Sequence, residues 1–127
     1  MAESTVLVVD DDAGFRAYVR AALEGEEFAV VEGANAREAV EVALRERPDG
    51  ILLDWRMPGG SGIVACRNLR AEPTLEGVRI AMITGLDDER DRTLARHAGA
   101  DAFLIKDPDP DALARQVRRL LTAPVTP

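Results

Sequence analysis

The residues best suited to chemistry in this sequence are a few polar side chains that follow or end short apolar runs: Asp10, Asp11, Asp12, Asp54, Thr84 and Lys106. Carboxylates that lie close together repel one another, so such a group has raised pKa values or holds a cation. Oxygen ligands without nearby histidine or cysteine suit a hard ion, and Mg²⁺ fits best because it keeps several waters and needs few protein ligands. A magnesium site with a carboxylate nucleophile, a hydroxyl and an ammonium can carry out phosphoryl transfer.

These polar residues must be positioned by the apolar runs, which alternate with helical stretches. The runs lack polar alternation, as is typical of strands buried on both faces of a parallel sheet; they cover residues 6–9, 28–31, 51–53, 80–83 and 103–105. Apolar residues at helical spacing predict helices over about residues 15–23, 35–46, 61–70, 88–98 and 113–121. The repeated alternation predicts a doubly wound α/β domain. Ligands bind such a sheet beyond the carboxyl ends of its strands, which is where the polar residues collect.

Composition and charge narrow the function classes. The chain has 127 residues, 46% of them hydrophobic and 31% charged, which predicts a single globular domain. A net charge of −7 argues against direct binding to nucleic acid, and no apolar run is long enough for a signal peptide or a membrane span. The one cysteine, Cys66, rules out an internal disulfide and favours a reducing compartment, so we expect a cytoplasmic location. Cys66 itself is predicted to be a small core residue.

In their order along the chain, these residues resemble the receiver domain of two-component response regulators. The resemblance covers about residues 5–121 and is strongest in the segments 8–12, 52–62, 82–85 and 98–106. The stretch 54–62, with its Met-Pro-Gly turn, is highly specific when combined with the acidic pair. The resemblance implies a flavodoxin-like, CheY-like (βα)5 three-layer sandwich with a five-stranded parallel sheet of order 2-1-3-4-5. Residues 1–4 would then be an N-terminal tail, and residues 122–127 a C-terminal tail or the start of a linker.

The resemblance assigns a phosphoacceptor and a metal site. Asp54 would accept the phosphoryl group. Asp10 and Asp11, together with Asp54 and the backbone carbonyl of Arg56, would hold Mg²⁺, for which Mn²⁺ could substitute.

The resemblance also assigns residues that bind the phosphoryl group and respond to it. Thr84 and Lys106 would each bind a phosphoryl oxygen. Phe103 occupies the aromatic switch position, whose ring turns inward when Thr84 moves toward the phosphoryl group. Arg56 and Leu86 flank the path of an attacking water, and we expect the apolar Leu86 to make dephosphorylation slow.

A domain of this kind would be regulatory rather than an enzyme, supporting only its own phosphorylation and autodephosphorylation. Its phosphoryl donor would be the phosphohistidine of a sensor histidine kinase or a phosphotransfer protein. It would act on a downstream output domain or target protein, and phosphorylation-dependent homodimers are common in relatives. No direct contact of this segment with nucleic acid or with a membrane is expected.

The segment after the fifth strand departs from the family pattern. Receivers commonly place proline directly after the conserved lysine, but here Asp107 follows Lys106 and Pro108 comes next. Lys-Asp at this place looks like receivers joined to LuxR-type helix-turn-helix domains, whereas residues 70–73 resemble other receiver groups, including stand-alone ones. The conformation after the strand therefore stays open at this point.

Two other functions fit some of the same residues. A haloacid-dehalogenase-like phosphatase would use Asp10 as nucleophile with Asp12 as its second carboxylate, although that motif wants threonine or valine where Gly14 stands. A phosphorylation-independent interaction module could share the fold. Taken singly, Asp12 is better explained as a helix N-cap and Thr84 as a strand residue. The joint placement of the polar residues favours the receiver.

Overall fold

Strands and helices alternate along the chain in the computed structural model, which describes residues 3–57 and 62–122. The elements are β1 (Ser4–Val9), α1 (Ala13–Glu24), β2 (Phe28–Gly33), α2 (Ala36–Glu46), β3 (Gly50–Asp54), α3 (Gly62–Arg70), the 3₁₀ turn η1 (Pro73–Leu75), β4 (Arg79–Thr84), α4 (Glu89–Ala98), β5 (Ala102–Ile105) and α5 (Pro110–Thr122). The predicted strands and helices are confirmed, with ends that differ by no more than a few residues. Most of the predicted Met-Pro-Gly turn (58–61) and the chain ends (1–2 and 123–127) lie outside the described residues.

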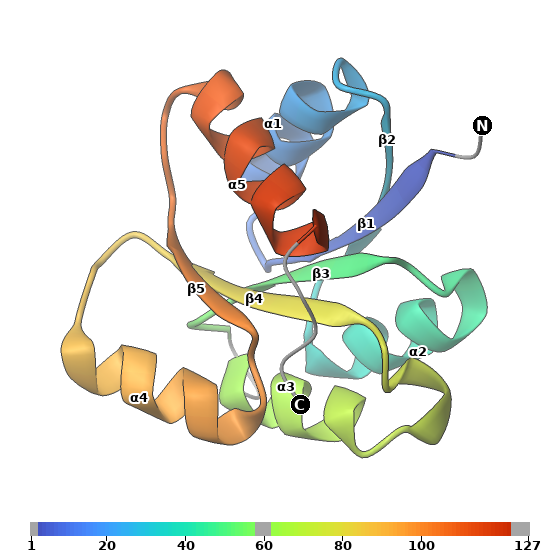
Figure 1. Cartoon of the computed structure of the whole chain (residues 1–127), viewed down its shortest axis with the longest axis vertical. Helices are drawn as coiled ribbons and strands as arrows, with labels where there is room; N and C mark the ends of the chain where they lie inside the picture. Colours follow the sequence, from blue (N-terminus) through green and yellow to red (C-terminus); the bar gives the residue numbers. More distant parts are fainter. Residues whose placement is uncertain (1–2, 58–61, 123–127) are drawn as a thin grey trace.

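The five strands form one parallel sheet in the order β2-β1-β3-β4-β5, which confirms the predicted flavodoxin-like topology. Helices α1 and α5 cover one face of the sheet, and α2, α3 and α4 cover the other (Figure 1). The register pairs Val9 with Leu53, Asp54 with Ile83, and Thr84 with Ile105. Strands β1, β3, β4 and β5 therefore end at one edge, where the chain places its polar residues.

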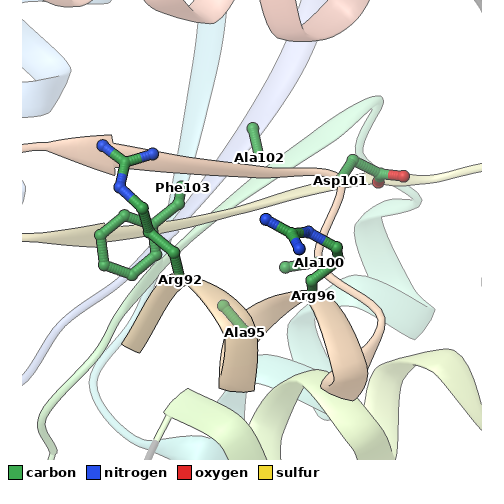
Figure 2. Close-up of a pocket in the computed structure, with 7 residues that line it drawn as sticks. All are labelled: Arg92, Ala95, Arg96, Ala100, Asp101, Ala102 and Phe103. Atoms are coloured by element: carbon green, nitrogen blue, oxygen red, sulfur yellow. The ribbon is translucent and has the colours of Figure 1, made fainter. Parts of the chain in front are cut away.

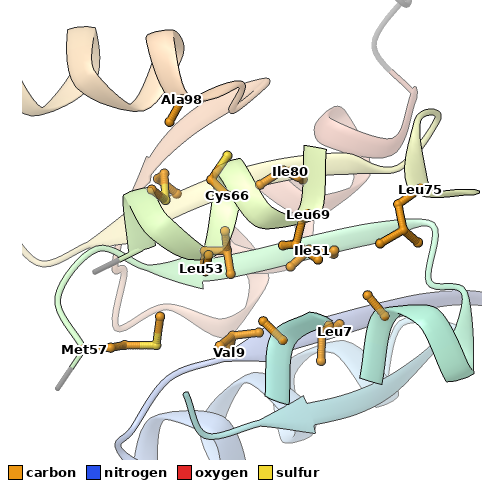
Figure 3. Packing of buried hydrophobic residues seen from close by; sticks show 14 of the residues in the cluster. Leu7, Val9, Ile51, Leu53, Met57, Cys66, Leu69, Leu75, Ile80 and Ala98 are labelled. Atoms are coloured by element: carbon orange, nitrogen blue, oxygen red, sulfur yellow. The ribbon is translucent and has the colours of Figure 1, made fainter. Parts of the chain in front are cut away.

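The core consists of two apolar layers, one on each face of the sheet. In a strand, successive side chains point to opposite faces. Leu7 and Val9 accordingly pack toward α2 and α3 (Figure 3), while Val6 and Val8 pack toward α1 and α5. This two-sided burial is why the strands read as continuous apolar runs.

Cys66 lies on α3 in the layer that this helix shares with α2 and α4, and its side chain is fully buried. The prediction of a small core residue is confirmed. Burial raises the pKa of its thiol to about 11, so the thiol stays protonated at neutral pH.

The amino-terminal end of β4 and β5 is held by one arginine. Arg70 Nε donates to the Gly99 carbonyl at 2.8 Å, and Nη1 donates to the Val78 carbonyl at 2.7 Å. Its Nη2 donates to Asp101, whose Oδ2 also accepts from the Ile80 backbone N–H at 2.8 Å. A single side chain at the end of α3 thus connects the segments that lead into both strands.

We expect Arg70→Met to lower the free energy of unfolding by about 2–3 kcal/mol, because two backbone carbonyls lose this donor and Asp101 loses its charged partner. Urea denaturation monitored by circular dichroism measures the change. Arg67→Met, at an exposed position on the same helix, is the matched control and should change the free energy by less than about 0.5 kcal/mol. Equal effects of the two substitutions would contradict the role given to Arg70.

Candidate functional site

Three carboxylates meet where β1 and β3 end. Asp10, Asp11 and Asp54 each offer an oxygen atom, and these oxygens all lie within 4.8 Å of one another. Asp10 is 1% exposed and Asp54 is 7% exposed, whereas Asp11 is open to solvent. The backbone holds Asp10 in place, since its N–H donates to the Gly33 carbonyl at 3.1 Å and its Oδ1 accepts from the Asp12 N–H at 2.8 Å. The structure therefore brings together the three predicted carboxylates.

Lys106 reaches this cluster from the end of β5. Its backbone N–H donates to the Thr84 carbonyl at 2.7 Å, which continues the pairing of β4 with β5. Its Nζ lies 3.0 Å from Asp10 Oδ2 and 3.5 Å from Asp54 Oδ1. One ammonium group thus contacts both buried carboxylates.

The electrostatics of the site follow from this arrangement. Burial, reinforced by the charge of Asp10, raises the pKa of Asp54, although Lys106 opposes the shift. Burial also disfavours the charged form of Lys106, but its hydrogen bond to Asp10 and the charge of Asp54 outweigh that effect and raise the pKa of the lysine. Lys106 is therefore a cation at neutral pH.

The donor set fits a hard divalent cation. Three carboxylates face one ammonium, so the negative charge of the cluster is only partly compensated. Arg16, which contacts the Asp10 backbone carbonyl, is paired with Glu32 at 2.9 Å. All the candidate ligands are oxygens, and the exposure of Asp11 leaves room for the waters that Mg²⁺ retains.

The predicted switch residues lie beside the cluster. Thr84 ends β4 and is 7% exposed, and its Oγ1 accepts from the Leu86 N–H at 3.4 Å. Phe103 lies on β5 and is half-buried. Its ring meets the Trp55 ring edge-on, with the two ring centroids 6.0 Å apart. The guanidinium carbon of Arg92 lies over the Phe103 ring, 5.0 Å from its centroid (Figure 2). These contacts place Phe103 between Trp55, the residue that follows Asp54, and Arg92 of α4; the switching of Phe103 stays a prediction.

The side chain of Asp12 serves the helix that follows it. Its Oδ1 accepts from the Gly14 N–H at 2.8 Å and from the Phe15 N–H at 3.4 Å, which confirms the predicted N-cap of α1. A phosphatase would need this carboxylate beside its nucleophile. The capping role weakens that alternative.

The sequence did not reveal that the first turns of α1 belong to the site. Phe15 was interpreted only as part of an apolar helix face, yet the Lys106 Nζ lies 4.2 Å from the centroid of its ring. The Tyr18 hydroxyl donates to the Asp107 carbonyl at 2.7 Å. Helical spacing alone could not show that α1 faces the segment after β5, because these residues lie far apart along the chain.

Comparison with known proteins decides the family. The family model of the response regulator receiver domain matches residues 6–118. The chain belongs to this family. Among curated relatives, the phosphate regulon transcriptional regulatory protein PhoB of Pseudomonas aeruginosa is 33% identical over 121 residues, covering 95% of this chain and 53% of PhoB. The transcriptional regulatory protein ResD of Bacillus subtilis is 37% identical over 119 residues, covering 94% of this chain and 48% of ResD. The receiver chain spans about half the length of these relatives.

Solved structures agree with this assignment. The chemotaxis protein CheY4 of Vibrio cholerae superimposes with a TM-score of 0.90 at 28% identity, covering 94% of this receiver and 100% of that chain. The BeF3-activated N-terminal receiver domain of Klebsiella pneumoniae RstA gives a TM-score of 0.84 at 30% identity, covering 94% of this receiver and 99% of that chain. The receiver is thus CheY-like in fold and belongs to two-component signalling. Within residues 3–57 and 62–122, none of the helices has the length and apolar character needed to cross a membrane.

Proposed function

We propose that this receiver accepts a phosphoryl group on Asp54 from the phosphohistidine of a sensor histidine kinase or a phosphotransfer protein. The observation that carries the proposal is the position of the Lys106 ammonium, which contacts both Asp10 and Asp54. Thr84 supplies a hydroxyl at the same edge of the sheet. A buried carboxylate with a cation and a hydroxyl beside it is equipped for phosphoryl transfer.

In the proposed reaction a carboxylate oxygen of Asp54 attacks the phosphorus atom. The bond between phosphorus and the donor's imidazole nitrogen breaks, its electron pair stays on the imidazole, and an acyl phosphate forms on Asp54. Lys106 neutralises one phosphoryl oxygen, and the Thr84 hydroxyl donates a hydrogen bond to another. Bound to Asp10, Asp11, Asp54 and the Arg56 carbonyl, Mg²⁺ (or Mn²⁺) would stabilise the charge that develops on the phosphoryl oxygens.

The conformational response would pass through Thr84 and Phe103. Movement of Thr84 toward the phosphoryl group frees space beside β4, and the Phe103 ring turns inward to fill it. Such a turn would break the contact between Phe103 and Arg92 and change the surface of α4. The partner that binds the changed surface would be an output domain, a target protein or a second receiver.

Labelling with acetyl phosphate tests the proposal without a kinase. Mg²⁺ binding can be followed separately, because Trp55 is the only tryptophan of the chain and is adjacent to Asp54, so its fluorescence should change when the metal binds. We expect Mg²⁺-dependent incorporation of one phosphoryl group, which mass spectrometry after borohydride reduction maps to Asp54. Label on Asp10 would favour the phosphatase. A chain that takes up no label would favour the phosphorylation-independent module.

The lifetime of the acyl phosphate should depend on Leu86, which is 65% exposed and lies two residues beyond Thr84. We expect Leu86→Glu to shorten the half-life by about tenfold, because a carboxylate can orient an attacking water and an isobutyl group cannot. The decay of labelled protein measures the half-life. Leu94→Glu, at an exposed leucine of α4 rather than of the segment that follows β4, is the control. An unchanged or longer half-life in Leu86→Glu would refute the idea.

A further inference from the structure

Two aromatic side chains of α1 lie against the lysine at the end of β5 and against the residue that follows it. We propose that Phe15 and Tyr18 are positioning residues that hold the Lys106 ammonium beside Asp54. The proposal deepens the proposed function and rests on it, because it takes Lys106 to be the group that neutralises the transferring phosphoryl oxygens.

Phe15 forms a surface for the ammonium group. The Lys106 Nζ lies 4.2 Å from the centroid of the Phe15 ring, well inside the range of a cation–π contact. Asp10 Oδ2 and Asp54 Oδ1 contact the same nitrogen at 3.0 and 3.5 Å. The ammonium is therefore held by two carboxylates and a ring face, and the flexible lysine side chain is confined to one region of the site.

Tyr18 fixes the backbone that carries the lysine. It lies one helical turn beyond Phe15, and the two ring centroids are 6.1 Å apart. Its hydroxyl donates to the Asp107 carbonyl at 2.7 Å, directly after Lys106, whose own N–H is bound by the Thr84 carbonyl. The backbone of Lys106 is thus tied to β4 on one side and, through Asp107, to α1 on the other.

The hydroxyl of Tyr18 keeps the proton that this hydrogen bond requires. Burial raises its pKa, and the negative charges of Asp107 and Asp109 raise it further. The segment 106–109 near this hydroxyl is also held by local contacts; for example, the Asp109 N–H donates to Asp107 Oδ1 at 2.8 Å. A contact within the segment shapes the turn, but it does not connect the turn to the rest of the site; the bond from Tyr18 connects it to α1.

The ring of Phe15 matters because the other partners of the ammonium change during the reaction. The carboxylates of Asp10 and Asp54 are the groups that would turn toward a metal ion and a phosphoryl group. An uncharged ring face does not take part in that exchange, so it keeps the ammonium in place while the carboxylates change partners. Loss of the ring should lower the rate of phosphorylation by about threefold to tenfold.

The composition of the chain provides a direct probe of this arrangement. Lys106 is the only lysine in the sequence, so protein labelled with ¹³C-lysine gives a single set of side-chain NMR signals. In the wild type the ring current of Phe15 should shift the ε-methylene proton signal upfield. We expect Phe15→Leu to abolish this upfield shift, whereas Phe15→Tyr, which keeps an aromatic ring, should retain it. Tyr18→Phe removes only the hydroxyl that binds the Asp107 carbonyl, and it should reduce the shift.

Each variant is also compared in three further measurements: the rate of labelling by acetyl phosphate at saturating Mg²⁺, Mg²⁺ affinity from Trp55 fluorescence, and thermal stability. The proposal predicts slower labelling in Phe15→Leu and Tyr18→Phe, recovery in Phe15→Tyr, and unchanged Mg²⁺ affinity. A wild-type ε-methylene signal without an upfield shift would overturn it. So would a loss of thermal stability in Tyr18→Phe with no change in the NMR signal or the labelling rate.

These readouts separate the failure of this proposal from failure of the proposed function. If the wild type takes up no phosphoryl group, the function proposed for Asp54 fails, while the NMR signal still shows whether Phe15 and Tyr18 position Lys106. If the wild type is labelled and the variants match it in rate and signal, only the positioning role fails.

Discussion

An Asp54→Asn chain is expected to lose phosphorylation by acetyl phosphate by at least about a thousandfold, because the amide has no nucleophilic oxygen of comparable strength. The same chain should be at least as stable as the wild type. Burial and the charge of Asp10 raise the pKa of Asp54, which means that the folded protein holds this carboxylate ionised at a cost at neutral pH. A neutral amide of the same shape removes that cost. Phosphate incorporation and urea denaturation measure the two effects.

Asp12→Asn is the matched control for this substitution. Asparagine caps a helix about as well as aspartate, so α1 should be unaffected and labelling should stay at the wild-type rate. The control also separates the candidate functions, since a phosphatase that uses Asp10 and Asp12 would lose activity in this variant. Undiminished labelling of Asp54→Asn would refute the assignment of the acceptor.

Gly62→Ala is expected to destabilise the protein by about 2–3 kcal/mol, because a methyl group has no room at this position. A Cβ at residue 62 would lie 2.4 Å from the Asp54 carbonyl oxygen and 3.1 Å from Cε of Met82. Either α3 moves away from the sheet or the end of β3 shifts. The second movement would displace the Asp54 side chain, so labelling should slow together with the loss of stability seen in urea denaturation.

Gly77→Ala provides the comparison, because a Cβ at residue 77 would have no neighbour within 4 Å. It should change the free energy of unfolding by less than about 0.5 kcal/mol and leave labelling unaltered. If Gly62→Ala were equally harmless, the close contact between α3 and the end of β3 would not constrain the site.

The fold and the central residues of the site could be predicted from the sequence because both depend on local patterns. Strands buried on both faces are apolar throughout, so the runs in β1, β3, β4 and β5 stand out, and the polar residue that ends each run marks its carboxyl end. Parallel strands place those ends at one edge of the sheet. Asp10, Asp54, Thr84 and Lys106 were therefore expected together. The Asp12 cap was predictable for a similar reason, since a helix needs an acceptor at its first turn.

Contacts between segments distant in the chain depended on the tertiary structure. Phe15 under the Lys106 ammonium, Tyr18 bound to Asp107, and Gly62 against the Asp54 carbonyl all join elements whose separation the pattern of apolar residues does not specify. By itself the sequence determined which side chains gather at the sheet edge, because strand direction and period place them there. Only the packing of α1 and α3 on the two faces of the sheet decided what holds those side chains in position, because helix packing depends on side-chain shape rather than on sequence period.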